Sequence, residues 1–361
     1  MNSIDKLFLL DAYALIYRAY YAFIKNPRIN SKGFNTSAIL GFVNTLEEVL
    51  KKENPTHIGV AFDPSGPTFR HEAYEQYKAQ REETPEAIRL SVPIIKDIIR
   101  AYRIPILEVS GYEADDVIGT LATEAGRQGI TTYMMTPDKD YGQLVSDRVF
   151  MYRPKHTGGF EVMGTEEVKT KFNIQTTEQV IDMLGLMGDA SDNIPGCPGV
   201  GEKTAQKLIA EFGSIENLLE HTDQLKGALK TKVETNREMI TFSKFLATIK
   251  TDVPIQLDMD SLVREEPNEE VFTYPGPNPF SKETAILMMA DSVEAASRSL
   301  PEYTEESISN LVDKIIDSQV QEGYFKECPI TFKDIATIKA VFKEKLKTIY
   351  HTRISYPELK K

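Results

Sequence analysis

Acidic residues follow one apolar segment after another in this chain, and this pattern restricts its possible folds more than any other feature. Asp11 ends the apolar run of residues 7–10, and Asp63 follows a second such run. Carboxylates that lie close together repel one another and resist burial, so they stabilise no fold by themselves. They do hold divalent metal ions, which prefer hard oxygen ligands. The acids of this kind are Asp11, Asp63, Glu113, Asp115, Asp116, Asp138, Asp140, Asp189 and Asp192.

The apolar segments alternate with helical patterns through the first half of the chain. We expect strands at residues 6–10, 57–62, 104–109 and 131–135, and a β-hairpin formed by residues 149–152 and 160–163. This alternation predicts an α/β fold with a doubly wound, mostly parallel sheet. In such a sheet the site lies beyond the carboxyl ends of the strands, so the acids up to Asp140 are expected to meet at one edge. The preference of helix N-termini for negative charge explains one or two of these acids, but not their recurrence.

Basic and aromatic side chains are interleaved over residues 68–84. A charge-rich helix of this kind is usually just a solvated face. Here the basic groups follow directly on Asp63, and aromatic residues between them suit unstacked nucleic-acid bases. We therefore favour a segment that contacts the substrate through Arg70, Tyr77, Lys78 and Arg81.

Tyrosines are unusually dense in the predicted helix of residues 13–23. Most of them are expected to fill the core. The alternative is that Tyr17, Arg18 and Tyr20 line a substrate channel, which makes Tyr20 a candidate DNA contact.

A glycine-rich turn lies in the helical region that begins after residue 176. Backbone amides at a glycine-rich helix start cradle phosphates, and a lysine there adds a point charge. The turn follows a motif with two aspartates, which together predict a helix-hairpin-helix that tracks a duplex backbone without reading its sequence. Its candidate contacts are Gly199, Val200, Gly201, Lys203 and Thr204.

The net charge of -12 argues against binding to nucleic acid, but this argument weakens when the nine clustered acids are counted separately. Residues 1–272 carry 30 Lys+Arg and 41 Asp+Glu, a balance of -11, and setting aside the nine clustered acids leaves -2. Local basic patches govern DNA binding more than the total charge does. The composition therefore leaves DNA available as a partner.

Two cysteines, Cys197 and Cys328, form neither a disulfide framework nor a metal-ligand spacing, which indicates a reducing cytoplasm. The apolar run before Asp11 is too short for a signal peptide. No later stretch is expected to span a membrane.

Six motifs resemble, in the same order, those of the 5′ nuclease domain of bacterial DNA polymerase I, which belongs to the flap endonuclease superfamily and has a PIN-like core. The resemblance covers about residues 1–272. The motifs are Leu9-Leu10-Asp11, Phe62-Asp63, Tyr77-Lys78-Ala79-Gln80-Arg81, Gly111-Tyr112-Glu113-Ala114-Asp115-Asp116, Thr136-Pro137-Asp138-Lys139-Asp140 and Gly188-Asp189-Ala190-Ser191-Asp192-Asn193.

The resemblance implies a role for each of these residues. Lys78 and Arg81 correspond to basic residues that face the scissile phosphate, in a helical arch through which a 5′ single strand passes. Two or more Mg²⁺ or Mn²⁺ ions are implied, and the glycine-rich turn resembles a phosphate hairpin that often holds a monovalent cation such as K⁺. The implied ligands are Asp11, Asp63, Glu113 and Asp115 for a first metal cluster, Asp138, Asp140, Asp189 and Asp192 for a second, and Asp116 between them.

The implied function is that of a structure-specific 5′ nuclease, a 5′-3′ exonuclease or flap endonuclease that hydrolyses DNA phosphodiesters in primer removal and repair. The expected domains are a PIN-like nuclease core with its arch over residues 1–175 and a helix-hairpin-helix DNA-binding region over residues 176–272. An all-α tail follows over residues 273–361, after a proline-rich join at residues 273–279.

The tail carries no polymerase motif and is expected to form three amphipathic helices, at residues 281–300, 304–321 and 331–350. Helices this short bury little area, so we expect a loosely folded tail unless its apolar faces are covered. Residues 275–296 resemble the C-terminal piece of an HD-family phosphohydrolase of the membrane-anchored, cyclic-dinucleotide type, in which Asp291 would be a metal ligand. The histidines and the His-Asp pair of that family have no counterpart here, which indicates an inactive fragment.

Three alternatives compete with the nuclease. A non-catalytic DNA-junction binder has no use for nine carboxylates next to a polyanion. A PIN-type ribonuclease generally lacks the helix-hairpin-helix. Activity from the HD-like tail is disfavoured by its missing ligands.

Overall fold

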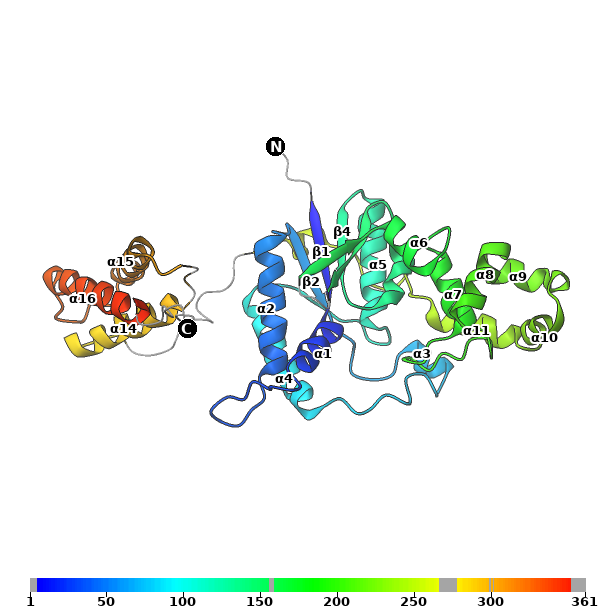
Figure 1. Cartoon of the computed structure of the whole chain (residues 1–361), viewed down its shortest axis with the longest axis horizontal. Helices are drawn as coiled ribbons and strands as arrows, with labels where there is room; N and C mark the ends of the chain where they lie inside the picture. Colours follow the sequence, from blue (N-terminus) through cyan, green and yellow to red (C-terminus); the bar gives the residue numbers. More distant parts are fainter. Residues whose placement is uncertain (1–4, 156–158, 266–277, 299, 301, 352–361) are drawn as a thin grey trace, which may run out of the picture. The chain divides into compact units, whose positions relative to one another are not determined.

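The computed structural model describes residues 5–155, 159–265, 278–298, 300 and 302–351. The chain forms two compact units, residues 1–272 and residues 273–361 (Figure 1). The proline-rich join predicted at residues 273–279 lies mostly outside the described residues.

The first unit is an α/β fold built on one six-stranded sheet in the order β3-β2-β1-β4-β5-β6. The first five strands in this order are parallel to their neighbours, and β6 pairs antiparallel with β5. The strands are β1 (Lys6–Asp11), β2 (His57–Ala61), β3 (Ile106–Leu107), β4 (Thr131–Met135), β5 (Val149–Pro154) and β6 (Phe160–Met163). The predicted mostly parallel sheet and its hairpin are therefore confirmed.

The central strand β1 explains why the sheet is covered on both faces. Leu7 and Leu9 join the core under α5 (Ala114–Arg127), whereas Phe8 and Leu10 join the core on the opposite face. A parallel strand that is buried on both faces has a continuous apolar run instead of an alternating one. The opposite face is covered by three helices, α1 (Ala12–Ala22), α2 (Ser37–Lys52) and α4 (Glu86–Ala101).

The third strand is shorter than expected. Only Ile106 and Leu107 pair with β2, although residues 104–109 were predicted as strand. The chain then leaves the sheet and turns at Gly111, whose φ of +84° lies in the left-handed region. This turn directs the following acids to the edge of the sheet.

A helical region with its own core follows the sheet. Its apolar centre includes Met183, Leu186, Leu208 and Ile240. The remaining helices of the first unit are η1 (Lys139–Leu144), α6 (Thr165–Phe172), α7 (Gln179–Met187), α8 (Glu202–Phe212), α9 (Ile215–Glu220), η2 (Thr222–Gln224), α10 (Gly227–Thr235), α11 (Arg237–Ala247) and α12 (Met259–Leu262).

The expected helical arch is wrong for most of residues 68–84. Only α3 (Phe69–Ala73) is helical before α4, and the chain between them forms turns. The reason is a set of long-range hydrogen bonds that replace helical ones. The Lys78 amide, at a φ of +56°, donates to the carbonyl of Asp192, and the Asn193 amide group donates to the carbonyl of Gln76.

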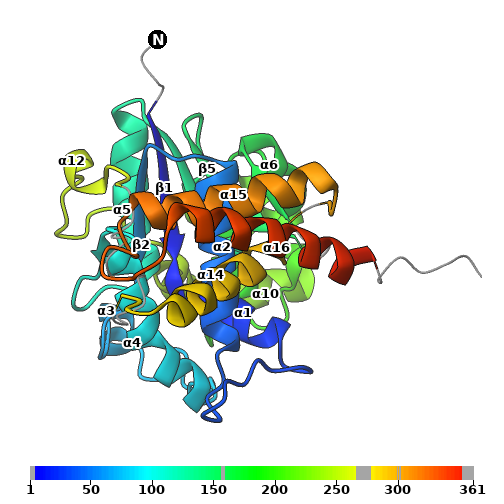
Figure 2. The ribbon, with the colours of Figure 1, turned by 90° about the vertical axis from the view of Figure 1, so that its left-hand side faces the viewer.

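The second unit consists of three helices around a core of their own. They are α14 (Lys282–Ser297), α15 (Glu305–Gln321) and α16 (Phe332–His351), which lie side by side in Figure 2. Val293, Val312 and Ile316 are buried between them. Ion pairs such as Lys343–Asp313 (2.7 Å) link α16 to α15. The expectation of a loosely folded tail therefore differs from the packing that the structure shows.

No helix in the described part of the chain is long and apolar enough to cross a membrane.

One prediction concerns the crossing of α1 and α2. A Cβ atom at Gly41 would lie 2.6 Å from the Cβ of Ala19, so the two backbones need glycine there. We expect Gly41→Ala to lower the free energy of unfolding by about 1–3 kcal/mol, measured by urea denaturation. Gly201→Ala is the matched control, because a Cβ there would meet nothing within 4 Å. Equal stability of the two variants would contradict this account.

Candidate active site

Carboxylates from separate strands meet at the carboxyl edge of the sheet. Asp11 ends β1, and burial together with the nearby charge of Asp63 raises its pKa to about 7. Burial and the charges of Asp11 and Asp138 raise the pKa of Asp115 well above its usual value. These mutual effects mean that acids far apart in the sequence repel one another across a small buried volume. The sheet topology brings these side chains together.

Each of these acids is also part of the local structure. Asp11 caps α1 by accepting a hydrogen bond from the amide of Ala14 (3.1 Å), and its other oxygen accepts one from the Thr136 hydroxyl (3.0 Å). Asp63 accepts a bond from the amide of Ala114 at the start of α5 (2.8 Å). The side chains are thus oriented before any ligand binds.

A second group of acids comes from η1 and from the loop after α7. Asp138 caps η1 by accepting a hydrogen bond from the amide of Asp140 (3.0 Å). Oδ1 of Asp140 is buried and has no hydrogen-bond partner, and burial together with Asp138 and Asp189 raises the pKa of Asp140 well above its usual value. Asp189 is held by Lys139 at 2.7 Å. Burial would raise the pKa of Asp189, but the bond to Lys139 lowers it.

Several of the carboxylates form ion pairs with basic side chains. Nζ of Lys78 lies 2.7 Å from Glu113, and Nη2 of Arg81 lies 2.5 Å from Asp192. Burial would raise the pKa of Glu113, but the charges of Lys78 and Arg70 lower it. Within the described residues, no three His, Cys, Asp or Glu side chains are arranged to hold a metal ion in this conformation.

The donor set nevertheless fits a hard divalent cation. Every candidate ligand is a carboxylate, the type that Mg²⁺ and Mn²⁺ prefer. Oδ1 of Asp140 is buried without a partner, and burial together with neighbouring carboxylates raises the pKa values of Asp11, Asp115 and Asp138. A cation at this edge would relieve both conditions.

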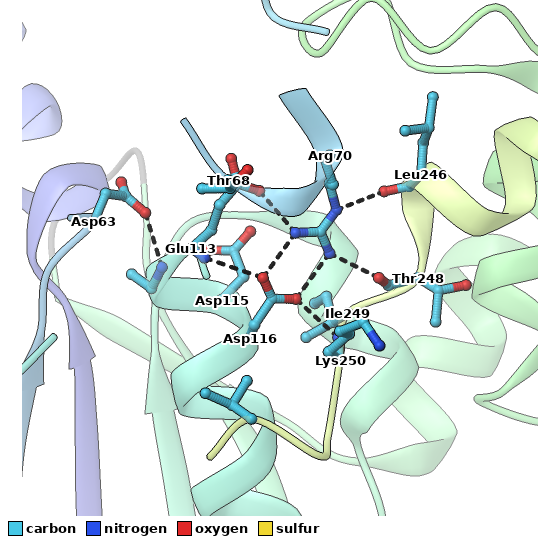
Figure 3. A network of polar contacts seen from close by, with 12 residues as sticks. Asp63, Thr68, Arg70, Glu113, Asp115, Asp116, Leu246, Thr248, Ile249 and Lys250 are labelled. Atoms are coloured by element: carbon cyan, nitrogen blue, oxygen red, sulfur yellow. Dashed lines mark hydrogen bonds and ion pairs between the residues drawn. The ribbon is translucent and has the colours of Figure 1, made fainter. Parts of the chain in front are cut away.

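Asp116 and Arg70 do not have the surroundings expected from the sequence (Figure 3). Asp116 is 0% exposed, and each of its oxygens accepts one bond from the Arg70 guanidinium and one from a backbone amide, of Glu113 or Lys250. Arg70 is 2% exposed and also bonds Glu113 and the carbonyls of Leu246 and Thr248. All five N–H donors of a guanidinium are thereby used. In this structure Asp116 therefore has both oxygens bonded by protein donors, and Arg70 is buried, unlike the open surroundings expected of a metal ligand and a DNA contact.

Tyr77 also differs from its expected role as a DNA-binding residue. Its side chain is only 3% exposed, and its hydroxyl donates to Glu113 (3.0 Å) and lies 3.2 Å from Asp192. A buried ring offers no face to a nucleobase. Tyr77 instead ties residues 74–81 to both groups of acids.

The glycine-rich turn has the expected form. Gly199 has a φ of +77°, and the extended Gly201 caps α8. Gly199, Gly201 and Lys203 are exposed, Thr204 is half-buried and Val200 is buried. In the first turn of α8 the amide of Thr204 donates to the carbonyl of Gly201 (3.0 Å). The amides of Glu202 and Lys203 precede this helical ladder, which suits a phosphate. Tyr20 is half-buried and packs edge-on against Tyr21, 5.3 Å between ring centroids.

Three residues at the site were not selected from the sequence. The Tyr141 hydroxyl, fully buried, bonds Asp115 (3.0 Å) and lies 3.5 Å from Asp11. Lys139 pairs with Asp189, and Gln143 bonds the carbonyl of Asp140 (3.0 Å). The sequence did contain a signal for them, because Lys139 lies between Asp138 and Asp140, and Tyr141 and Gln143 follow Asp140 within three residues. Polar groups that are buried there must find a hydrogen-bond partner.

Two family models cover most of the first unit. Residues 6–173 match the 5′-3′ exonuclease N-terminal, resolvase-like domain. Residues 175–270 match the 5′-3′ exonuclease C-terminal SAM fold. Residues 6–270 belong to the 5′-3′ exonuclease family. The chain therefore carries a nuclease domain.

Sequence relatives of this nuclease domain are bacterial DNA polymerases I. The protein of Bacillus subtilis is 38% identical over 371 residues, which covers 95% of this chain and 41% of that protein. The protein of Bacillus caldotenax is 38% identical over 321 residues, with coverage of 88% and 36%. The chain thus spans well under half the length of these relatives. Neither these relatives nor the two family models support the HD-family resemblance of the tail.

Solved structures with a similar fold include T5 5′-exonuclease with bound zinc, at 19% identity and a TM-score of 0.57 over 86% of this chain and 98% of that chain. A flap endonuclease of bacteriophage T5 in a complex with DNA and metal ions has a TM-score of 0.54 and 19% identity, with the same coverage. The catalytic core of Rad2 with DNA substrate has a TM-score of 0.50 and 17% identity over 74% of this chain and 85% of that chain. These similarities establish the fold.

Two aspartates should respond in opposite ways to the loss of charge. In EDTA at pH 8, we expect Asp116→Asn to cost about 3–5 kcal/mol of unfolding free energy, since it removes one of the two carboxylates that neutralise the buried Arg70. Asp140→Asn should instead add roughly 0.5–2 kcal/mol. A raised folded-state pKa means that ionisation destabilises the fold as pH rises, so this gain should grow with pH. Chemical denaturation of both variants at pH 5 and pH 8 measures these effects, and destabilisation by both at pH 8 would refute the distinction.

Proposed function

We propose that the chain is a structure-specific 5′ nuclease, a 5′-3′ exonuclease or flap endonuclease that hydrolyses DNA phosphodiesters in a divalent-metal reaction. The observation that carries this proposal is the convergence of mutually repelling carboxylates beside Lys78 and Arg81, in a member of the 5′-3′ exonuclease family. The solved structures of similar fold that contain DNA support DNA as the substrate class.

Eight acids form the proposed metal site. When bound, two or more Mg²⁺ or Mn²⁺ ions would supply an activated water and stabilise the leaving oxygen. The proposed ligands are Asp11, Asp63, Glu113 and Asp115 for one cluster and Asp138, Asp140, Asp189 and Asp192 for the other. Asp116 is left out, because its four hydrogen bonds already satisfy both oxygens.

Lys78 and Arg81 are the proposed catalytic side chains. In this conformation they neutralise Glu113 and Asp192, at the edge where the acids meet. Burial would lower the pKa of Lys78, but the nearby carboxylates raise it, so its ammonium group stays charged at neutral pH. A phosphate that approaches this edge would receive both positive charges and be held in place while negative charge builds on its oxygens.

The exposed turn at Gly199, Gly201 and Lys203 is the proposed duplex grip. Its amides and its lysine suit backbone phosphates, and a K⁺ ion is the proposed additional cation there. Val200 and Thr204 support the turn, and Tyr20 is the proposed contact at the end of α1.

The domain functions follow from these assignments. Residues 1–175 form the proposed PIN-like nuclease core, residues 176–272 the proposed duplex-binding region and residues 273–361 a proposed inactive tail. A cytoplasmic location and a polymerase module outside these residues remain predictions.

Two alternatives are separated from this proposal by one assay. The chain is incubated with a 5′-flap DNA duplex, with the flap strand alone and with an RNA flap, each in Mg²⁺ and in EDTA. We expect EDTA-sensitive cleavage of the DNA flap duplex in preference to the other two. Binding without cleavage in Mg²⁺ would favour a junction binder, and preferred cleavage of RNA would favour a ribonuclease.

Substitutions of two lysines should affect duplex binding and cleavage differently. Lys203→Ala should weaken duplex binding and lower the salt slope by about one unit, because roughly one phosphate contact is lost. Lys78→Ala should reduce kcat by roughly 10²-fold and affect binding less. Binding by fluorescence anisotropy in EDTA and single-turnover cleavage in Mg²⁺ give the two readouts. Lys51→Ala, an exposed lysine on α2, is the control, and like effects of Lys78→Ala and Lys203→Ala in both assays would contradict the proposal.

A further inference from the structure

The last two residues of α11 and the three residues after them, residues 246–250, form a segment that we name the strap. Arg70 donates to the carbonyls of Leu246 (2.9 Å) and Thr248 (2.7 Å). Gln143 donates to the carbonyl of Ala247 (3.1 Å) and accepts from the amide of Ile249 (2.9 Å). Two buried side chains thus hold successive residues of the strap from different elements.

The same two side chains also hold the proposed metal ligands. Arg70 bonds Glu113 at 3.0 Å. Gln143, 8% exposed, donates to the carbonyl of Asp140 at 3.0 Å. Asp140 is the acid whose Oδ1 is buried and unpartnered, so its position depends strongly on its backbone. Gln143 is therefore the link between this backbone and the strap.

The strap is continuous with the proposed duplex-binding region. It begins at the last turn of α11, and α11 packs against α7, with a Cβ at Gly185 reaching only 3.1 Å from the Cα of Lys244. The Ser243 hydroxyl accepts a hydrogen bond from the amide of Gly196 (2.9 Å), between Asp192 and the glycine-rich turn. A displacement of α11 would therefore be passed to the strap and to the side chains that hold it.

We infer that Gln143 is a positioning residue that fixes Asp140 through the strap and so couples the duplex-binding helices to the metal site. It touches neither substrate nor metal. Its amide supplies one acceptor and two donors, and the structure uses all three. The inference rests on the proposed function, because it takes Asp140 to be a metal ligand.

The test compares two buried glutamines. Gln143→Met keeps the length of the side chain and removes its three bonds. Gln179→Met is the matched control, because Gln179 is 7% exposed and bonds the carbonyl of Gly213 and the amides of Gln175 and Thr176, outside the proposed metal site. The readouts are the Mg²⁺ concentration at the midpoint of the Mg²⁺-induced rise in Tm, kcat on a 5′-flap duplex, and the Kd for the duplex in EDTA.

We expect Gln143→Met to raise the Mg²⁺ midpoint or to lower kcat by at least about tenfold, the usual effect of removing a group that orients a metal ligand. Its Kd in EDTA should stay within about twofold of wild type. Gln179→Met should lower the Tm by a similar amount and leave the Mg²⁺ midpoint and kcat within about twofold. If Gln143→Met does not fold, Gln143→Glu replaces it, since this change keeps the acceptor for Ile249 and removes the donors.

Wild-type values of both the Mg²⁺ midpoint and kcat in the Gln143 variant would overturn the inference, and so would an equal loss in Gln179→Met. Failure of the proposed function gives a different result, in which the wild-type protein itself shows no Mg²⁺-dependent cleavage. The Tm measurement uses Mg²⁺ alone as the probe, so the positioning role is tested apart from activity.

Discussion

Repulsion among buried carboxylates is the constraint on which the rest of this structure depends. Parallel strands end at one edge, and the three adjacent strands β2, β1 and β4 are followed there by Asp63, Asp11 and Asp138. Charges withdrawn from water repel one another strongly because the surrounding dielectric is low. Arg70, Lys78 and Lys139 each offset part of that charge through a close ion pair. The remainder, marked by the unpartnered oxygen of Asp140, is charge that a bound cation would offset, and any ligand that binds only the folded state stabilises it.

The acids therefore fall into two kinds with different surroundings. Asp116 is neutralised from within the protein by a guanidinium and two backbone amides. Asp115, its neighbour in the chain, faces Asp11 and Asp138 instead. Adjacent residues on a helix point about 100° apart, so one can face the protein interior while the other faces the site. The first turn of α5 thus joins a structural ion pair to the edge of the sheet that we propose as the metal site.

The sequence predicted the sheet well because hydrophobic patterning and strand–helix alternation are local signals. The observed bounds of β2 and β4 agree with the predicted ones to within a residue. The surroundings of Arg70 and Tyr77 could not be predicted in the same way, because their partners lie 36 to 178 residues away in the sequence. Basic and aromatic interleaving looks the same whether the side chains face solvent or are buried against acids. The turns of residues 74–85 could not be predicted for the same reason, because hydrogen bonds to residues far away in the sequence replace those of a local helix.

The central position of β1 has a consequence for how the chain is made. This strand is synthesised before the other five strands of the sheet, yet its two neighbours are β2 and β4, and the acid at its end lies beside groups that follow β4. The last supports, the strap and its contacts with Arg70 and Gln143, are synthesised about 240 residues after Asp11, and late long-range pairings of this kind are slow to form. A nascent chain therefore holds the acids without the framework that orients them. The proposed metal site can therefore be completed only after the whole nuclease domain has emerged from the ribosome.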